Sequence, residues 1–513
     1  MADPTTLKLP QAIQDVELVE EVPGTKQISS SEKAFTGHGP GEAVARSKAE
    51  KSLLLKLDLT IVPLSTLIYF VAYLDRNSIG NARLMGLEKD LGLSSEQFYN
   101  CLTMFYVGYI VFMLPGNICL RLPHVRAPVL IGGSVFLFGA FCTGLGGSQN
   151  YATVLTLRIF VGASQAFIQG LGLYLSFWYK RNELATRSGI LYSAATISGA
   201  FSGLIAYGVQ KDLTENVTGL EPWRLLFIIE GSAAMFVGML TMIVLPRFAD
   251  KMGKRNNWLL SATDVDLAIE RARGYNTIGA KVDVRQIWTA LRDPKSWLFA
   301  CINAGVALGI ASVGSFLPTF VKAFGYSATK SQLFTVIPYA CATVSTVVVS
   351  YSSDRLNLKG PCLMMTLSVA CVGYIILLTA YSVPVLVFAT CLITAGLYPS
   401  VILLTTWLGV NTGGFTKRGT TWSMAEIFGQ SFGILGTHIY TAPPRFVKGH
   451  AVVLGFLLVG VVCAFTLICL MRYLNKHKEA KLQLYLSRGE PHPHAESSLE
   501  EEGDNHLSFR YIL

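Results

Sequence analysis

The stretch WRLLFIIEGSAAMFVGMLTMIVL, residues 223–245, indicates the fold class, because about 20 consecutive apolar residues are enough to cross a bilayer as a helix. Eleven similar runs occur between the polar N-terminal region and the polar residues after about 473. The sequence therefore predicts an all-α membrane protein with spans at 57–75, 98–118, 127–147, 151–175, 188–209, 223–245, 296–320, 332–352, 362–381, 384–408, 420–440 and 450–472.

The longest connection, residues 247–295, separates six runs from six. This layout predicts two six-helix halves, 53–246 and 296–473, with a substrate cavity between them near the middle of the bilayer. The flanking regions 1–52 and 474–513 are polar and without motifs, and we expect the first to be disordered.

Two short helices are expected in the long connection. Ser261 and Asp264 form a capping-box pattern that predicts a helix ending near Arg273. A second helix, in the cytoplasmic loop 247–295, is amphipathic, and we expect its apolar face to lie against the ends of the bundle. That face comprises Val284, Ile287, Trp288 and Leu291.

Composition excludes several classes of protein. The chain is 51% hydrophobic and 15% charged, which is unlike a soluble domain. Its net charge of +9 comes without basic clusters interleaved with aromatic residues, so we expect no nucleic-acid partner. The 10 cysteines lie in apolar runs without a C-x-x-C pair, which predicts neither a metal site nor a disulfide framework. There is no phosphate-binding loop or H-E-x-x-H motif, so we expect neither an enzyme nor a cofactor.

The distribution of basic residues predicts the orientation. With both termini on one side, that side holds 32 of the 42 Lys and Arg residues, which places it in the cytoplasm. The sequon Asn216-Val217-Thr218 then falls in an outer loop, where glycosylation is possible.

Charged residues inside apolar spans are functional by default. Arg158 in the fourth span is either an anion-binding group or a charge that locks helices together, and the sequence leaves both open. Glu230 and Glu426 present a similar choice between a proton carrier and a helix-locking charge.

Other polar groups have simpler interpretations. Asp75 and Arg76 close the first span, and we expect them to form an ion pair at its outer rim. For His438, in the eleventh span, the sequence favours a packing role.

Several stretches resemble the major facilitator superfamily, and in particular its fungal anion:cation symporter branch, the allantoate and nicotinate permease group. They are LDRNSIGNAR (74–83), WYKRNELATR (178–187), PWRLLFIIEG (222–231) and SDR (353–355). The resemblance implies proton-driven uptake, and it implies that Asp354 and Arg355 latch helices at the cytoplasmic face. The chain departs from the branch pattern at Gln165, where the branch has a glutamate, and at Gly170, where it has a proline.

These observations predict a secondary transporter for a small organic anion, such as a carboxylate metabolite or vitamin, working by alternating access and coupled to protons. We expect it to be a monomer in the lipid bilayer of the plasma membrane, with the vacuolar membrane as an alternative. Arg158 is the expected anion contact, and its loss should abolish transport. The other expected lining residues are Gln165, Tyr69, Asn303, Tyr339, Trp407 and Gln430.

The sequence leaves two alternative functions open. The chain could export a secondary metabolite, since the missing glutamate at position 165 removes a protonatable neighbour of Arg158. It could also be a nutrient receptor or sensor built on a transporter scaffold.

Overall fold

The computed structural model describes residues 40–513 except 123, 180, 249–258, 274–282 and 489–502. The chain divides into two compact units, Met1–Ser52 and Leu53–Leu513, and the second unit contains the helix bundle. The expectation of a disordered N-terminal tail falls largely on residues 1–39, outside the described residues.

The described residues form helices and no strands. The helices before the long connection are α1 (Pro40–Leu84), α2 (Leu87–Asp90), α3 (Ser95–Arg121), α4 (Ala127–Gly146), α5 (Tyr151–Ala166), η1 (Phe167–Gln169), α6 (Gly170–Ser176), α7 (Arg181–Asp212), α8 (Glu215–Thr218) and α9 (Pro222–Val244). The remainder are α10 (Ala262–Arg273), α11 (Val284–Arg292), α12 (Pro294–Ala323), α13 (Ala328–Phe334), α14 (Val336–Leu356), α15 (Lys359–Thr379), α16 (Val383–Asn411), α17 (Phe415–His438), α18 (Val447–Arg488) and η3 (Gly503–Asn505).

Every predicted span falls on one helix or on consecutive ones, and the span 151–175 covers three: α5, η1 and α6. Within the described residues, 11 helical segments are long and apolar enough to cross a membrane. The remaining predicted span, 420–440, is α17, which is too polar to be among them. A twelve-span topology therefore stays a prediction.

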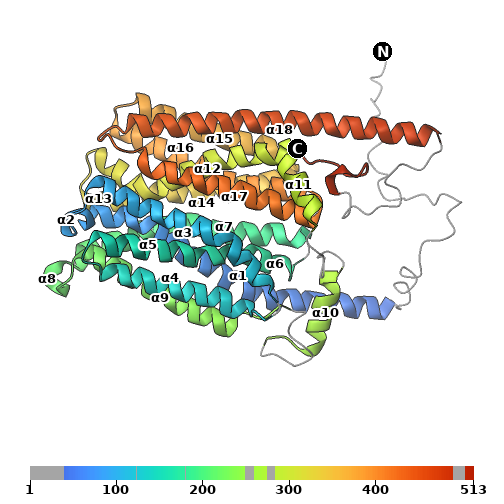
Figure 1. The fold of residues 1–513 in the computed structure, drawn as a ribbon, viewed down its shortest axis with the longest axis horizontal. Helices are drawn as coiled ribbons and strands as arrows, with labels where there is room; N and C mark the ends of the chain where they lie inside the picture. Colours follow the sequence, from blue (N-terminus) through green and yellow to red (C-terminus); the bar gives the residue numbers. More distant parts are fainter. Residues whose placement is uncertain (1–39, 123, 180, 249–258, 274–282, 489–502) are drawn as a thin grey trace, which may run out of the picture. The chain divides into compact units, whose positions relative to one another are not determined.

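Within residues 53–513 the long helices run side by side, with the helices before and after the long connection in separate groups (Figure 1). In the first half α4 packs on α9 and α3 on α5, and in the second α15 packs on α16 and α12 on α17. The α3–α5 contact is close because a Cβ at Gly162 would lie 2.0 Å from the carbonyl oxygen of Phe105. Glycine at this position lets the two backbones touch.

Hydrogen bonds between the two halves close one end of the gap between them. Near that end, the Thr103 and Thr437 hydroxyls are 2.8 Å apart, and the Tyr99 hydroxyl donates to the carbonyl oxygen of Tyr440 at 3.0 Å. His438 belongs to the same group of contacts, with Nε2 3.3 Å from Oδ1 of Asn100. We call these contacts, between the start of α3 and the end of α17, the closed end.

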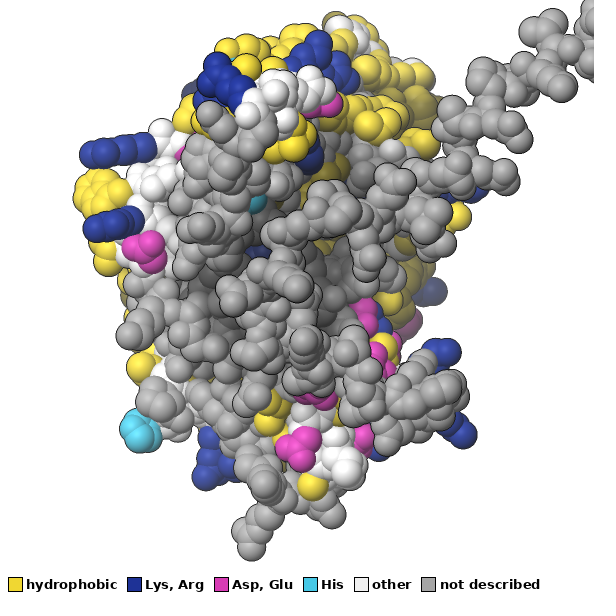
Figure 2. Space-filling model, turned by 90° about the vertical axis from the view of Figure 1, so that its right-hand side faces the viewer, with side chains coloured by type: hydrophobic (Ala, Val, Ile, Leu, Met, Phe, Trp, Pro, Cys, Tyr) yellow, Lys and Arg dark blue, Asp and Glu magenta, His cyan; other side chains and the backbone are white. Residues whose placement is uncertain are grey.

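The opposite end of the bundle carries the helices of the long connection. Figure 2 looks onto this end and shows Lys and Arg side chains around its margin. The capping box of α10 is confirmed, with Asp264 N donating to Ser261 Oγ at 3.2 Å and Ser261 N to Asp264 Oδ2 at 3.0 Å.

The expected packing of α11 is wrong. Val284 and Trp288 are 62% and 58% exposed, whereas Ala290 on the other side of the helix is buried. The polar side of α11 meets α17, where Lys417 N donates to Gln286 Oε1 at 3.2 Å. Hydrogen bonding to the start of α17 thus turns the apolar face outward.

Candidate functional site

A cavity lies between the two halves, with about 800 Å³ of empty space that includes its open mouth. Helices α1, α3, α7 and η1 line it from the first half, and α12, α16 and α17 from the second. The lining residues are Tyr69, Tyr73, Arg76, Asn77, Tyr106, Gln169, Tyr192, Asn303, Val306, Ala307, Ile310, Ala311, Gly314, Ser315, Tyr398, Val401, Thr405, Trp422, Glu426 and Gln430.

The lining explains why α17 is polar for a membrane helix. Trp422, Glu426 and Gln430 follow one another at intervals of four residues, so they form one stripe along the helix. This stripe faces the cavity, where water or a substrate replaces lipid as the neighbour.

Arg76 and Glu426 are the charged residues of the lining, one from each half of the protein. Gln430 Nε2 lies 3.3 Å from Glu426 Oε2. No carboxylate oxygen of the described residues lies within the 4.0 Å ion-pair distance of Arg76. The guanidinium therefore makes no direct ion pair with these residues, and Glu426 is the carboxyl group that shares the cavity with it.

Aromatic rings and one amide fix the position of Arg76. Its guanidinium carbon lies 4.7 Å from the ring centre of Tyr109 and 5.0 Å from those of Tyr73 and Phe105. Its Nε donates to Gln165 Oε1 at 3.1 Å. Cation–π contacts and this hydrogen bond orient the fork of the guanidinium.

Gln165 is a bridge and does not line the cavity. Its carbonyl accepts from Arg76, while its amide nitrogen donates to Asp75 Oδ2 at 2.9 Å. Asp75 also accepts from the Cys142 thiol at 3.3 Å. A glutamate at position 165 could still accept from Arg76 but would have no amide group to donate to Asp75, so the glutamine is what allows both hydrogen bonds.

Arg158, the expected anion contact, is absent from the cavity lining. It is 2% exposed, its Nη1 lies 3.6 Å from Asp75 Oδ2, and its guanidinium carbon lies 5.0 Å from the Phe105 ring centre. The side chain is therefore a buried partner of Asp75 within the first half. In this conformation Arg158 does not reach the cavity lining and pairs with a carboxylate of another helix, as the helix-locking alternative expects, while its Nε and Nη1 make no hydrogen bond among the described residues; its role in transport stays a prediction.

The position of Asp75 and Arg76 at an outer rim is also wrong. Because α1 continues to Leu84, these residues lie within the helix. Asp75 is 1% exposed and turns into the first half, whereas the adjacent Arg76 reaches the cavity. Polar residues such as Asn77, Ser78 and Asn81 interrupt the apolar pattern of α1. The predicted span therefore ended at residue 75, about two turns before the end of the helix.

Glu230 is buried within the first half, away from the cavity lining. Ser78 Oγ lies 2.5 Å from its Oε1, and Oε2 has no hydrogen-bond partner among the described residues. Ser202 Oγ is in turn 3.1 Å from Ser78 Oγ. These contacts join α1, α7 and α9.

Three expected lining residues are present in the cavity: Tyr69, Asn303 and Gln430. Two others lie behind or beyond it. The Tyr339 hydroxyl donates to Oδ1 of the lining residue Asn77 at 3.2 Å, which joins the two halves. Trp407 is fully buried, and its Nε1 donates to the Ile512 carbonyl oxygen at 2.8 Å.

The remaining predicted residues lie at the surface or at the closed end. Asp354 pairs with Lys359 across the α14–α15 turn, and Arg355 is exposed. Asn216 is exposed in α8. His438 belongs to the closed end and does more than pack, because it contacts Thr103 and Asn100 of the other half.

Comparison with known proteins shows the same architecture. The family model described as "Major Facilitator Superfamily" matches residues 65–437. The chain is 29% identical to the "High-affinity nicotinic acid transporter" of Saccharomyces cerevisiae over 90% of its own length and 85% of the relative. It is 31% identical to the "MFS-type transporter cnsO" of Penicillium expansum, covering 92% of each chain.

Solved structures of low sequence identity share the fold. The proton:xylose symporter XylE bound to 6-bromo-6-deoxy-D-glucose aligns with a TM-score of 0.64, at 15% identity, over 81% of this chain and 95% of that one. Family match, relatives and fold agree with the resemblance carried by the sequence motifs. The chain belongs to the Major Facilitator Superfamily and is a multi-pass membrane protein, a secondary transporter of small molecules with fungal transporters among its relatives.

Proposed function

We propose that this transporter moves a flat aromatic or heteroaromatic monocarboxylate, and that Arg76 is its anion contact. The observation that carries the proposal is an oriented guanidinium in the cavity without a carboxylate partner among the described residues. Arginine pairs with a carboxylate through two parallel hydrogen bonds. Its Nε is engaged by Gln165, so the two terminal nitrogens are the groups for the substrate.

The aromatic lining supports a flat substrate. Five tyrosines and one tryptophan contribute to the cavity surface, and rings of this kind stack on planar ligands. The residues are Tyr69, Tyr73, Tyr106, Tyr192, Tyr398 and Trp422. The yeast relative is named for nicotinic acid, which is a molecule of this class.

Glu426 is the proposed proton-coupling group. It lines the cavity from the second half, whereas Asp75 and Glu230 are buried inside the first half. A carboxyl group beside the substrate can exchange its proton with whichever side of the membrane the cavity faces. Proton-driven uptake across the plasma membrane, with the basic end of the bundle in the cytoplasm, completes the proposal.

An uptake screen tests this function. Cells producing the protein are given radiolabelled monocarboxylates, nicotinic acid among them, over a series of external pH values. We expect saturable accumulation that rises at acidic external pH and is lost in the Glu426→Gln variant. Efflux without uptake in oriented vesicles, or uptake of neutral analogues alone, would overturn the direction or the substrate class.

A further inference from the structure

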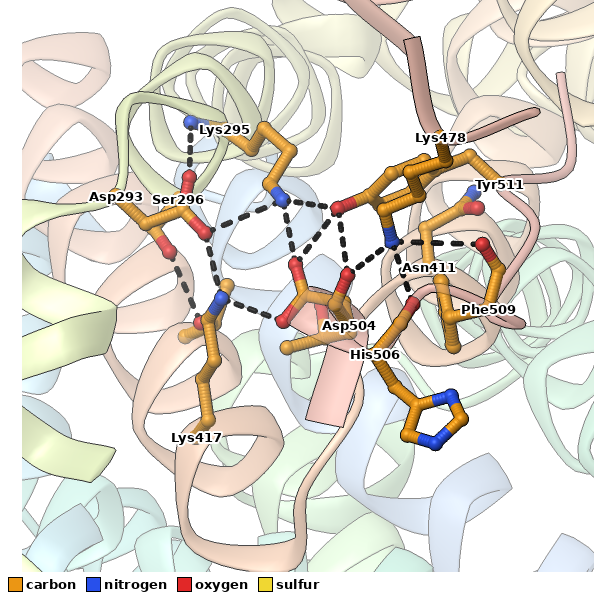
Figure 3. Close-up of polar contacts among 12 residues, drawn as sticks. Asp293, Lys295, Ser296, Asn411, Lys417, Lys478, Asp504, His506, Phe509 and Tyr511 are labelled. Atoms are coloured by element: carbon orange, nitrogen blue, oxygen red, sulfur yellow. Dashed lines mark hydrogen bonds and ion pairs between the residues drawn. The ribbon is translucent and has the colours of Figure 1, made fainter. Parts of the chain in front are cut away.

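Residues 503–513, expected to be part of a featureless polar tail, are folded onto the second half of the protein. Asp504 is 1% exposed, and His506, Leu507 and Tyr511 are also buried. Figure 3 shows polar contacts linking this stretch to side chains of α12, α16, α17 and α18. We call residues 503–513 the docked segment.

The centre of the contact is one carboxylate held between two ammonium groups. Asp504 Oδ2 lies 2.5 Å from Lys295 Nζ, and Asp504 Oδ1 lies 2.6 Å from Lys417 Nζ. Burial would raise the pKa of Asp504, but the charges of Lys295 and Lys417 outweigh it and hold the pKa below its usual range. The carboxylate is therefore charged at neutral pH.

A third lysine binds the backbone of the docked segment. Lys478 Nζ donates to the carbonyl oxygens of Asp504, His506 and Phe509, the last two at 3.1 and 3.4 Å. Three carbonyls around one ammonium require the turn that residues 504–509 make. The lysine thus recognises the fold of the peptide as well as its charge.

Two asparagines on the transporter add paired hydrogen bonds. Asn411 donates to the Ile512 carbonyl oxygen at 2.8 Å and accepts from Ile512 N at 2.7 Å. Asn475 makes the same pair of bonds with Tyr511, each at 2.9 Å. This is the hydrogen-bond pattern of strand pairing, made here by side-chain amides.

Charge balance shows what the receiving site needs. Lys295, Lys417 and Lys478 are all less than 10% exposed, and Asp293, 2.7 Å from Lys417, is a resident carboxylate near them. Buried charges are stable only when paired. The docked segment contributes to this burial, and without it three cations gathered around Asp293 would repel one another, so the site attracts an acidic ligand.

Helix α17 extends from the receiving site, past the transport cavity, to the closed end. Lys417 lies at the start of this helix, Glu426 lines the cavity at its middle, and His438 belongs to the closed end. The turn before α17 also touches the docked segment, since a Cβ at Gly413 would lie 2.3 Å from Asp504 N. Alternating access requires the two halves to rearrange around the cavity.

We propose that Lys295, Lys417, Lys478, Asn411 and Asn475 form a receptor site for an acidic peptide, filled here by residues 503–513 of the same chain, and that its occupancy holds α17 in the conformation with a closed end. A ligand that binds one conformation shifts the population toward it. Release of the docked segment therefore opens the closed end more often.

Peptide binding tests the receptor site without knowledge of the transported substrate. The probe is a fluorescent synthetic peptide of residues 503–513, added to purified transporter lacking residues 489–513. We expect saturable binding, loss of binding when the peptide carries Asp504→Asn, and no binding to the full chain, whose site is filled. The matched control peptide carries Asn505→Ala at an exposed position and should bind normally. Equal binding of the Asp504→Asn peptide, or no binding to a shortened transporter that remains folded, overturns the receptor site.

Accessibility of the closed end tests the coupling to α17. A Thr103→Cys variant is labelled with a maleimide, with the ten native cysteines measured as background in the parent protein. We expect several-fold faster labelling when Asp504→Ala is added and no change when Asn505→Ala is added. If the shortened protein does not fold, this full-length comparison still decides. Unchanged labelling in a folded Asp504→Ala protein refutes the restraint on α17.

Discussion

Replacing Arg76 with lysine tests the proposed anion contact while keeping its charge. Gln165 already engages Nε, so a substrate carboxylate would bind the two terminal nitrogens as a fork. Lysine offers a single ammonium and loses one of these bonds. A hydrogen bond to a charged group contributes about 1.5–3 kcal/mol, and a tenfold change corresponds to about 1.4 kcal/mol. The Michaelis constant should therefore rise by about 10- to 150-fold.

The assay is the initial rate of radiolabelled nicotinic acid uptake, corrected for the amount of protein in the membrane. Arg83→Lys is the matched control, because Arg83 lies on the same helix but pairs with Glu88 at 3.0 Å, outside the cavity lining. We expect the control to transport with an unaltered KM. An unaltered KM in Arg76→Lys would refute the role of the guanidinium fork.

Four further predictions concern other parts of the molecule. Arg158→Met leaves the buried carboxylate of Asp75 without its cation and should lower the free energy of unfolding by about 3–5 kcal/mol. Thermal unfolding in detergent measures this loss. The fraction of the variant that remains folded should transport with the KM of the parent. Gln165→Glu removes the amide group that donates to Asp75 and places a carboxylate against Arg76. This variant should bind a substrate carboxylate more weakly and show a higher KM in the uptake assay, whereas an unaltered KM would contradict the bridge. The pKa of Asp504 is lower in the docked state, so its charge stabilises docking at every pH above the ordinary pKa of an aspartate, and this contribution is lost only as the pH falls through the lowered value. Peptide binding, measured over a pH series, should therefore persist from neutral pH down to about pH 4. Release of the peptide near pH 6 would contradict the ion pairs. If the loop that contains Asn216 is outside and glycosylated, the Asn216→Gln variant should migrate faster on a gel than the parent. Labelling of an Asn216→Cys variant from the cytoplasmic side alone would contradict the predicted orientation.

The helices could be predicted because lipid imposes a simple requirement. A span of about 20 apolar residues is visible in a single sequence, and the long connection divides the spans into two sets. α17 departs from this requirement, because it carries a polar stripe and packs on α12 and α3. The polar stripe of α17 lines the cavity. The sequence already indicates this stripe, because Trp422, Glu426 and Gln430 are spaced four residues apart.

The choice between two arginines could not be made from the sequence. A charged residue in a span indicates a functional or structural role, but the sequence does not show toward which neighbour its side chain points. Arg158 and Arg76 lie on different helices, and packing sets the rotation of each helix. The structure turns Arg158 toward Asp75 and Arg76 toward the cavity. Placing Arg76 required knowing that α1 continues to Leu84.

The docking of residues 503–513 could not be predicted from the sequence either. Asp504 follows three glutamates in a polar region, a pattern typical of solvated chain. Its partners Lys295, Lys417 and Lys478 stand 26 to 209 positions away in the sequence. Long-range pairing of this kind leaves no local pattern, so only the folded structure shows it.

Binding of a matched carboxylate and carboxamide to the purified transporter tests the central claim most directly. Nicotinic acid and nicotinamide share one ring and differ in the charge that Arg76 is proposed to recognise. We predict that the parent and Arg158→Met proteins prefer the acid and that Arg76→Gln loses this preference. A preference for the acid that survives in Arg76→Gln and disappears in Arg158→Met would contradict the account.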